Sequence, residues 1–141
     1  MSDDAAKRRA ERAASAEYHA EAERRKREQE ASEAQVLLDR FVEQATATGL
    51  ATEELTAKPW TGRGRYKTGV VGWYLRKDHS VGVGLDGRYY LVVVSPERFG
   101  RWRTVPVAPT PPTLQVGQGA RDAESVALST LLGMRLEWTS S

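Results

Sequence analysis

The sequence contains no cysteine and only two histidines, His19 and His79, among its 141 residues. Without cysteine there can be no disulfide framework, no thiol nucleophile and no thiolate metal site. Two histidines are too few for a histidine-rich metal centre. We therefore expect no metal and no cofactor.

Long hydrophobic runs are also absent. No apolar stretch approaches the roughly 20 residues that a membrane-spanning helix needs, so we expect no integral membrane protein and no membrane partner. The chain begins Met-Ser-Asp-Asp, with acids where a signal peptide has a basic start followed by an apolar stretch. These features favour a cytoplasmic location, and the Ala- and Arg-rich bias is typical of a bacterial gene of high GC content.

Charge is divided unevenly along the chain. Residues 1–48 carry nine Lys/Arg and eleven Asp/Glu, whereas residues 49–141 carry twelve and eight. The modest basic excess of the second part permits contact with polyanions without requiring it.

The length of the chain suits one domain. Four Trp and five Tyr are too many for a wholly disordered chain.

The first 48 residues predict one long helix with two different parts. No proline or glycine occurs between Asp4 and Thr48, and the prevailing residues are good helix formers. Residues 1–33 lack a large apolar stripe, which predicts a polar, partly disordered helical arm, either solvated or docked on a partner. From residue 34 an apolar stripe wide enough to lie on a sheet appears, and Gly49 suits the helix end. The stripe consists of Ala34, Leu37, Leu38, Phe41, Val42 and Ala45.

Residues 62–95 alternate with a period of two, as in β-strands. Residues 50–61 are interpreted as a connector, and the two residues Asp86-Gly87 predict a tight hairpin. A two-residue turn there places Val83 opposite Tyr90; a similar turn at Asp78-His79 places Tyr74 opposite Val83. The long helix is expected on the face that carries Trp73, Leu75, Gly82, Gly84, Tyr89, Leu91 and Val93. Strands are expected at residues 70–76, 80–85, 88–95, 99–107 and 114–116.

A second helix is expected near the C-terminus, with Asp122 as its N-cap. Residues 134–138 fit either a helix or a strand. The chain as a whole predicts an α+β fold: a long N-terminal helix, a small antiparallel sheet of three to five strands and a C-terminal helix. Residues 34–141 form the predicted α+β domain.

Three motifs resemble functional sites, and local structure explains each more simply. Gly82-Val-Gly84-Leu-Asp-Gly87 matches GxGxxG, but its third glycine opens a strand where dinucleotide binding needs a helix. Asp78-His79-Ser80 has the letters of a catalytic triad, but contiguous residues in a turn cannot converge as the relay requires. The loop 117–122 precedes a helix, where Asp122 would occupy the amides that an anion would need. We therefore expect a protein that is not an enzyme.

The remaining candidate is a mixture of basic and aromatic residues along the strands, the combination that binds single-stranded nucleic acid. The alternative is that the rings are core beneath the C-terminal helix and that the arginines protect a sheet edge. The sequence thus favours a non-catalytic interaction protein with a protein partner, docking through the arm or a sheet face. The second hypothesis is a nucleic-acid or ribosome-associated binder. The possible polyanion-binding residues are Arg63, Arg65, Lys67, Tyr74, Arg76, Lys77, Arg101 and Arg103.

Overall fold

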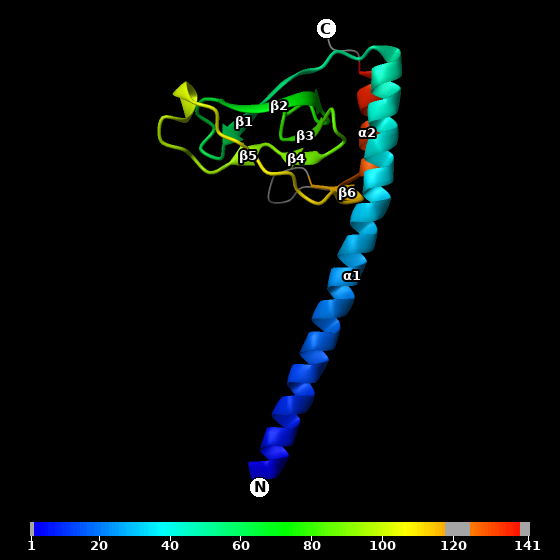
Figure 1. Ribbon diagram of the computed structural model, residues 1–141, viewed down its shortest axis with the longest axis vertical. Coiled ribbons are helices and arrows are strands. Elements are labelled where there is room, and N and C mark those ends of the chain that lie inside the picture. The colour runs from blue at the N-terminus through cyan, green and yellow to red at the C-terminus, as the bar shows by residue number, and fades with distance from the viewer. Residues whose placement is uncertain (1, 118–124, 139–141) are drawn as a thin grey trace.

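The computed structural model describes residues 2–117 and 125–138. Two helices, α1 (Ser2–Thr48) and α2 (Leu128–Glu137), lie together on one side of a small curved sheet, and the N-terminal half of α1 extends away from it (Figure 1). This arrangement confirms the predicted α+β class. No helix among the described residues is long and apolar enough to cross a membrane.

The C-terminal part of α1 is the part that packs. Ala34, Leu38, Phe41 and Ala45 are all buried, which confirms the predicted stripe. The ring of Phe41 meets Trp73 of the sheet edge-on, with centroids 5.8 Å apart. The helix ends at Thr48, and the residue that follows, Gly49, has a φ of +72°, a conformation that glycine adopts without cost.

The arm is helical and makes few contacts. From residue 3 to residue 29 nearly every side chain is exposed, and the ion pairs within the described arm join neighbouring turns, such as Arg24 with Glu21 at 3.6 Å. The first hydrogen bond to the rest of the protein is at Glu30, where Oε1 accepts the Leu114 N–H at 2.9 Å. Contact with the sheet domain therefore begins one helical turn before the apolar stripe.

Five strands form one sheet in the order β4-β3-β2-β1-β5. Neighbours are antiparallel except β5, which runs parallel to β1, so the sheet is mixed rather than wholly antiparallel as predicted. The strands are β1 (Glu53–Pro59), β2 (Tyr66–Tyr74), β3 (Val81–Gly84), β4 (Tyr89–Leu91) and β5 (Val93–Val94).

Strand β1 corrects the interpretation of residues 50–61 as a connector. Leu55, Ala57 and Pro59 are its buried positions, and they do alternate. Glu, Lys, Ala and Pro are poor strand formers, however, so composition hid the strand. Pairing with β2 on one side and β5 on the other overrides that local preference.

The sheet closes on itself at Val92. Its N–H donates to the Ser80 carbonyl at 2.9 Å, and its own carbonyl accepts the Lys58 N–H at 2.8 Å. Strands β4 and β5 are consecutive parts of the segment 89–94, which therefore hydrogen-bonds to β3 on one side and to β1 on the other. The result is a small barrel-like sheet with an interior of its own.

The predicted register is wrong by one residue at both hairpins. Val83 pairs with Tyr89 and with Trp73, and Gly82 pairs with Tyr90. The second loop contains three residues because Gly87 adopts a φ of +83°, and this extra residue shifts the pairing. At the first loop, the Leu75 N–H donates to the Val81 carbonyl and leaves five residues between them.

The register decides which side chains share a face. The helix-facing cluster contains Trp73, Leu75 and Tyr89 as predicted, but with Val81 and Val83 in place of Gly82 and Gly84. Leu91 and Val93, also expected on that face, are exposed. The barrel interior holds a second cluster made of Leu55, Tyr74, Tyr90 and Val92.

The last third of the chain departs furthest from prediction. In place of a strand at 99–107 there is a short 3-10 helix, η1 (Gly100–Trp102), followed by an isolated parallel bridge between Thr104 and Lys67. The edge strand near residue 115 is confirmed as β6 (Gln115–Val116), paired with β7 (Val126–Ala127). Helix α2 begins only at Leu128 and continues to Glu137, so residues 134–137 are helical. Asp122 lies outside the described residues.

Candidate polyanion-binding surface

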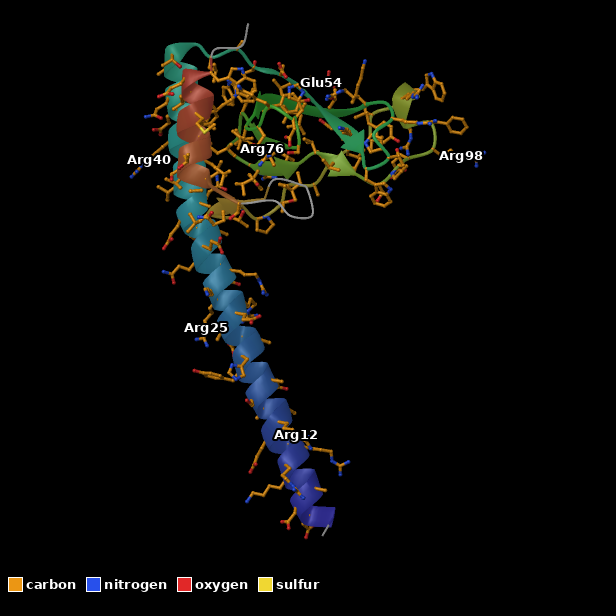
Figure 2. The ribbon with its side chains drawn as sticks, turned by 180° about the vertical axis from the view of Figure 1, so that it is seen from behind. Arg12, Arg25, Arg40, Glu54, Arg76 and Arg98 are labelled. Atoms are coloured by element: carbon orange, nitrogen blue, oxygen red, sulfur yellow. The ribbon has the colours of Figure 1, made fainter. Side chains whose placement is uncertain are left out.

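Two loops meet at the end of the barrel furthest from α1. They are residues 60–65, which join β1 to β2, and residues 95–104 around η1, and together they are called the tip. Figure 2 shows Arg98 at this end, whereas Arg76 lies near the helices. The tip is therefore a surface that neither helix covers.

Tyr66, the first residue of β2, holds the two loops together. Its ring is buried, and its hydroxyl accepts the Glu97 N–H at 3.0 Å. The Gly100 backbone lies so close to this ring that an added β-carbon would fall 2.6 Å from ring carbon Cε1. Arg101 in turn lies against Gly64, where an added β-carbon would be 3.1 Å from its Nε. These contacts fix η1 against the β1–β2 connection.

Three large aromatic side chains project from the tip into solvent. Trp60 is 68% exposed, Phe99 60% and Trp102 77%. The Phe99 and Trp102 centroids are 6.0 Å apart with the rings tilted by 46°. Phe99 also has a φ of +60°, which is uncommon for a bulky residue and is typical of functional or strained sites. Isolated exposed apolar residues are ordinary, but clustered ones indicate a binding surface.

The same two loops also carry arginines. The tip carries a single carboxylate, Glu97, which pairs with Arg103 at 3.0 Å. The Arg98 guanidinium lies 5.3 Å from the Phe99 centroid, within the range of a cation–π contact. Arg65 donates to the Thr56 hydroxyl at 3.0 Å. The five exposed arginines of the tip are Arg63, Arg65, Arg98, Arg101 and Arg103.

The structure brings together some of the residues predicted to bind polyanions and separates the others. Arg63, Arg65, Arg101 and Arg103 belong to the tip, and exposed Lys67 follows it on β2. Arg76 and Lys77 lie at the opposite end of the barrel, in the β2–β3 loop beside α2.

Tyr74 offers no free ring face. It is buried in the barrel interior, its hydroxyl accepts the Thr56 N–H at 2.7 Å, and its ring stacks on His79 at 4.0 Å. Tyr90 lies in the same interior cluster. These rings are core, as the alternative interpretation held, but the strands of the sheet enclose them rather than α2.

Sequence reasoning does not identify Trp60 and Phe99 as site residues, because it interprets residues 50–61 as a connector and residues 99–107 as a strand. The residues beside them indicate a loop: Pro59 and Gly62 flank Trp60, and Pro96 and Gly100 flank Phe99. Proline and glycine favour turns, and a side chain in a turn is more often exposed than one in a sheet.

The other motifs adopt local structures. Residues 82–87 form the β3–β4 hairpin, as predicted. In the β2–β3 loop the Ser80 hydroxyl donates to Asp78 Oδ1 at 2.6 Å, while the His79 ring stacks on Tyr74. Most of loop 117–122 lies outside the described residues.

Within the described ranges, no group of three His, Asp or Glu side chains is close enough to hold a metal ion. Comparisons with protein families, with curated proteins and with solved structures find no match for this chain.

Proposed function

We propose that this protein is a non-catalytic binding protein that holds single-stranded nucleic acid at its tip. The observation that carries the proposal is the concentration of three exposed rings and five arginines on two adjoining loops that carry one carboxylate. The proposal includes the cytoplasmic location that the sequence favours.

The chemistry of the tip suits an unpaired strand better than a duplex. An exposed ring can stack on any base, but only when that base is free of its own neighbours. Arginine binds phosphate with a planar set of donors and is the residue that recurs at such contacts. Duplex readout, in contrast, uses an element that fits a groove, and the tip presents short loops instead.

Fluorescence anisotropy with a labelled 12-nucleotide oligo(dT) or oligo(U) at low salt tests the proposal. We expect Phe99→Ala and Trp102→Ala each to weaken binding by about tenfold, as loss of one base–ring stack implies. Tyr18→Ala is the matched control, because Tyr18 is similarly exposed, at 66%, but lies on the arm. Absence of binding, or equal losses for all three variants, would contradict the proposal.

Anionic lipid provides the discriminating comparison, because rings and cations on a loop also suit a membrane surface. Sedimentation with vesicles of phosphatidylserine and phosphatidylcholine measures that binding directly. Binding to the vesicles without binding to either oligonucleotide would assign the tip to a membrane and overturn the proposal.

A protein partner for the arm is the second candidate function. The observation that favours it is a helix whose residues 3–29 project from the domain with nearly every side chain exposed. Cross-linking in nuclease-treated lysate, with the full chain and with a chain lacking residues 2–26, tests this candidate. A protein adduct that requires residues 2–26 would support an interaction role, and an identical pattern from both chains would remove it.

A further inference from the structure

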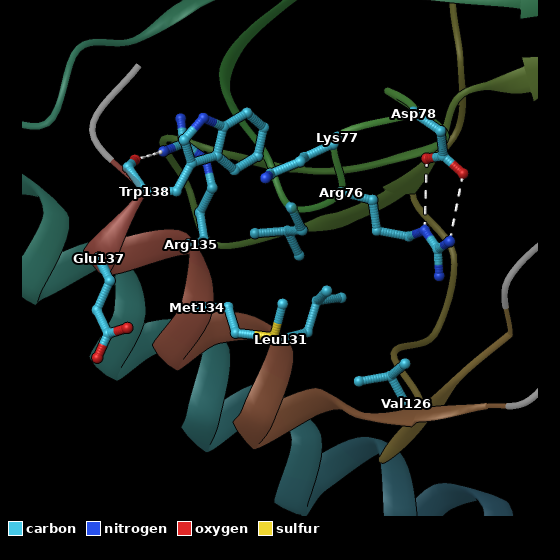
Figure 3. A pocket seen from close by; sticks show the side chains of 10 residues that line it. Arg76, Lys77, Asp78, Val126, Leu131, Met134, Arg135, Glu137 and Trp138 are labelled. Carbon is cyan, nitrogen blue, oxygen red and sulfur yellow. Dashed lines mark hydrogen bonds and ion pairs between the residues drawn. The ribbon is translucent and has the colours of Figure 1, made fainter. Parts of the chain in front are cut away.

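A second site lies at the other end of the barrel, between α2 and the β2–β3 loop. A pocket of about 640 Å³ opens there, a size that suits a small organic molecule (Figure 3). It shares no lining residue with the tip, and nothing proposed for the tip depends on it.

The floor of the pocket is apolar. It is formed by Leu75, which directly follows β2, Val126 of β7, and Leu131 and Met134 of α2. Met134 remains more than half exposed although its helix packs on α1. An apolar floor of this kind binds hydrocarbon by removing both surfaces from water.

The wall opposite this floor carries two cations, Arg76 and Lys77. Arg76 pairs with Asp78, at 3.3 Å, and donates to the Gly117 carbonyl. Lys77 instead points toward the Trp138 ring, with Nζ 5.7 Å from its centroid. Across residues 2–117 and 125–138, no carboxylate lies within ion-pair distance of Lys77.

Arg135 is the stronger indication. Arg135 is only 6% exposed. Its guanidinium donates to two backbone carbonyls, those of Tyr74 at 2.7 Å and Trp138 at 2.8 Å. No carboxylate in the described part of the chain forms an ion pair with it, and the charge of Glu53 acts on it only from beyond ion-pair distance. A buried cation is costly unless a counter-charge accompanies it.

Glu137 is the other acid that lines the pocket, and Figure 3 shows its carboxylate directed away from Lys77. Lys77 and Arg135 therefore both line a pocket with an apolar floor, and the Arg135 guanidinium lies 4.5 Å from the centroid of the Trp138 ring. Asp78 is already paired with Arg76. We infer that this pocket binds a small amphipathic organic anion, a carboxylate or sulfonate carrying an alkyl chain or ring. The chain or ring would cover Leu131 and Met134, and the acid group would lie toward Lys77 and Arg135.

Methionine provides a direct reporter, because Met134 and Met1 are the only two in the chain. A protein labelled with ¹³C at its methionine methyl groups is titrated with octanoate, with 1-octanol and with octylammonium. We expect octanoate to shift the Met134 signal saturably and leave Met1 unchanged. The alcohol and the ammonium ion should bind at least about tenfold more weakly, since neither supplies the counter-charge.

Lys77→Gln tests the charge without disturbing the core, because Lys77 is exposed in a loop. We expect this variant to bind octanoate about fivefold more weakly, as loss of one partly exposed ion pair implies. Lys58→Gln, an exposed lysine on β1, is the matched control and should bind as the wild type does. No saturable shift at Met134, equal affinity for octanoate and 1-octanol, or equal affinity of the two lysine variants would each overturn the inference.

Discussion

Tyrosine shows how strongly the surroundings of a single residue decide its role. Tyr18 projects from the arm into solvent, Tyr66 anchors the tip, and Tyr74 is buried inside the barrel. The Tyr74 hydroxyl accepts the Thr56 N–H at 2.7 Å and lies 3.1 Å from the Thr56 hydroxyl. A ring predicted to stack on a base therefore serves to join β1 to β2.

We expect Tyr74→Phe to lower the free energy of unfolding by about 1–2 kcal/mol, because the variant leaves the partly buried Thr56 N–H without its acceptor. Tyr18→Phe removes an equally polar hydroxyl from an exposed ring and should leave stability unchanged. Urea unfolding followed by circular dichroism measures both. Equal stability of the two variants would show that the hydrogen bond contributes nothing.

Asp78 makes part of the stability dependent on pH. Burial alone would raise the pKa of its carboxyl group, but hydrogen bonds from the Ser80 hydroxyl and N–H and from Arg76, with the charge of Arg76, outweigh burial and lower the pKa below its ordinary 3.8. A lowered pKa stabilises the fold above the ordinary value, and this contribution is lost as the pH falls through the folded-state value.

We therefore expect Asp78→Asn to be less stable than the wild type at pH 6, with the difference shrinking below pH 3.8. Denaturant unfolding of both proteins between pH 6 and pH 2 measures the difference. Asp3→Asn, on the arm, is the control and should follow the wild type throughout. A difference independent of pH would mean that the asparagine acts through shape rather than charge.

Among the elements, helix periodicity was readable from the sequence and strand pairing was only partly so. The stripe from Ala34 to Ala45 is a local pattern with a 3.6-residue repeat, and its burial follows directly. Strand β1 depends on partners distant in sequence, and its Glu, Lys and Pro conceal it. The register depends on one residue in the Gly87 loop, and a shift of one moves every side chain to the other face.

The two parts of α1 should contribute very differently to stability. Deleting residues 2–26 removes exposed helix before the contact at Glu30, so we expect the melting temperature to change by no more than about 2 °C. Leu38→Ala leaves a cavity beneath the same helix and should lower the free energy of unfolding by about 2–5 kcal/mol. Thermal unfolding by circular dichroism compares the two. A large fall in melting temperature on deletion would show that the arm stabilises the domain.

At the scale of the whole molecule, the sequence predicts which residue types form the candidate surface but not where in the fold they lie. The sequence indicated arginines near aromatic rings, and four of the eight residues it named belong to the tip. It could not show that residues 60–65 and 95–104 meet, because that contact runs through the ring of Tyr66 and the bare backbone of Gly100. Nor could it separate Arg76 and Lys77, whose loop the fold directs toward α2.

The charge of the whole molecule leads to a test that separates the tip from the arm. Residues 2–33 carry eight basic and nine acidic side chains, so the arm has almost no net charge to offer a polyanion. The tip carries five arginines and one carboxylate. If four of them contact phosphates, affinity for a single strand should fall about 50-fold between 50 and 200 mM salt, because counterions are released on binding.

Anisotropy titrations at four salt concentrations measure this slope for three chains. The chain lacking residues 2–26 should keep both the affinity and the slope of the wild type, because its tip is intact. Arg101→Gln should bind more weakly and flatten the logarithmic slope by about 0.7, the effect of one lost phosphate contact. If the deletion flattened the slope and Arg101→Gln did not, the clustered basic residues of the arm would be the binding site and the tip would not.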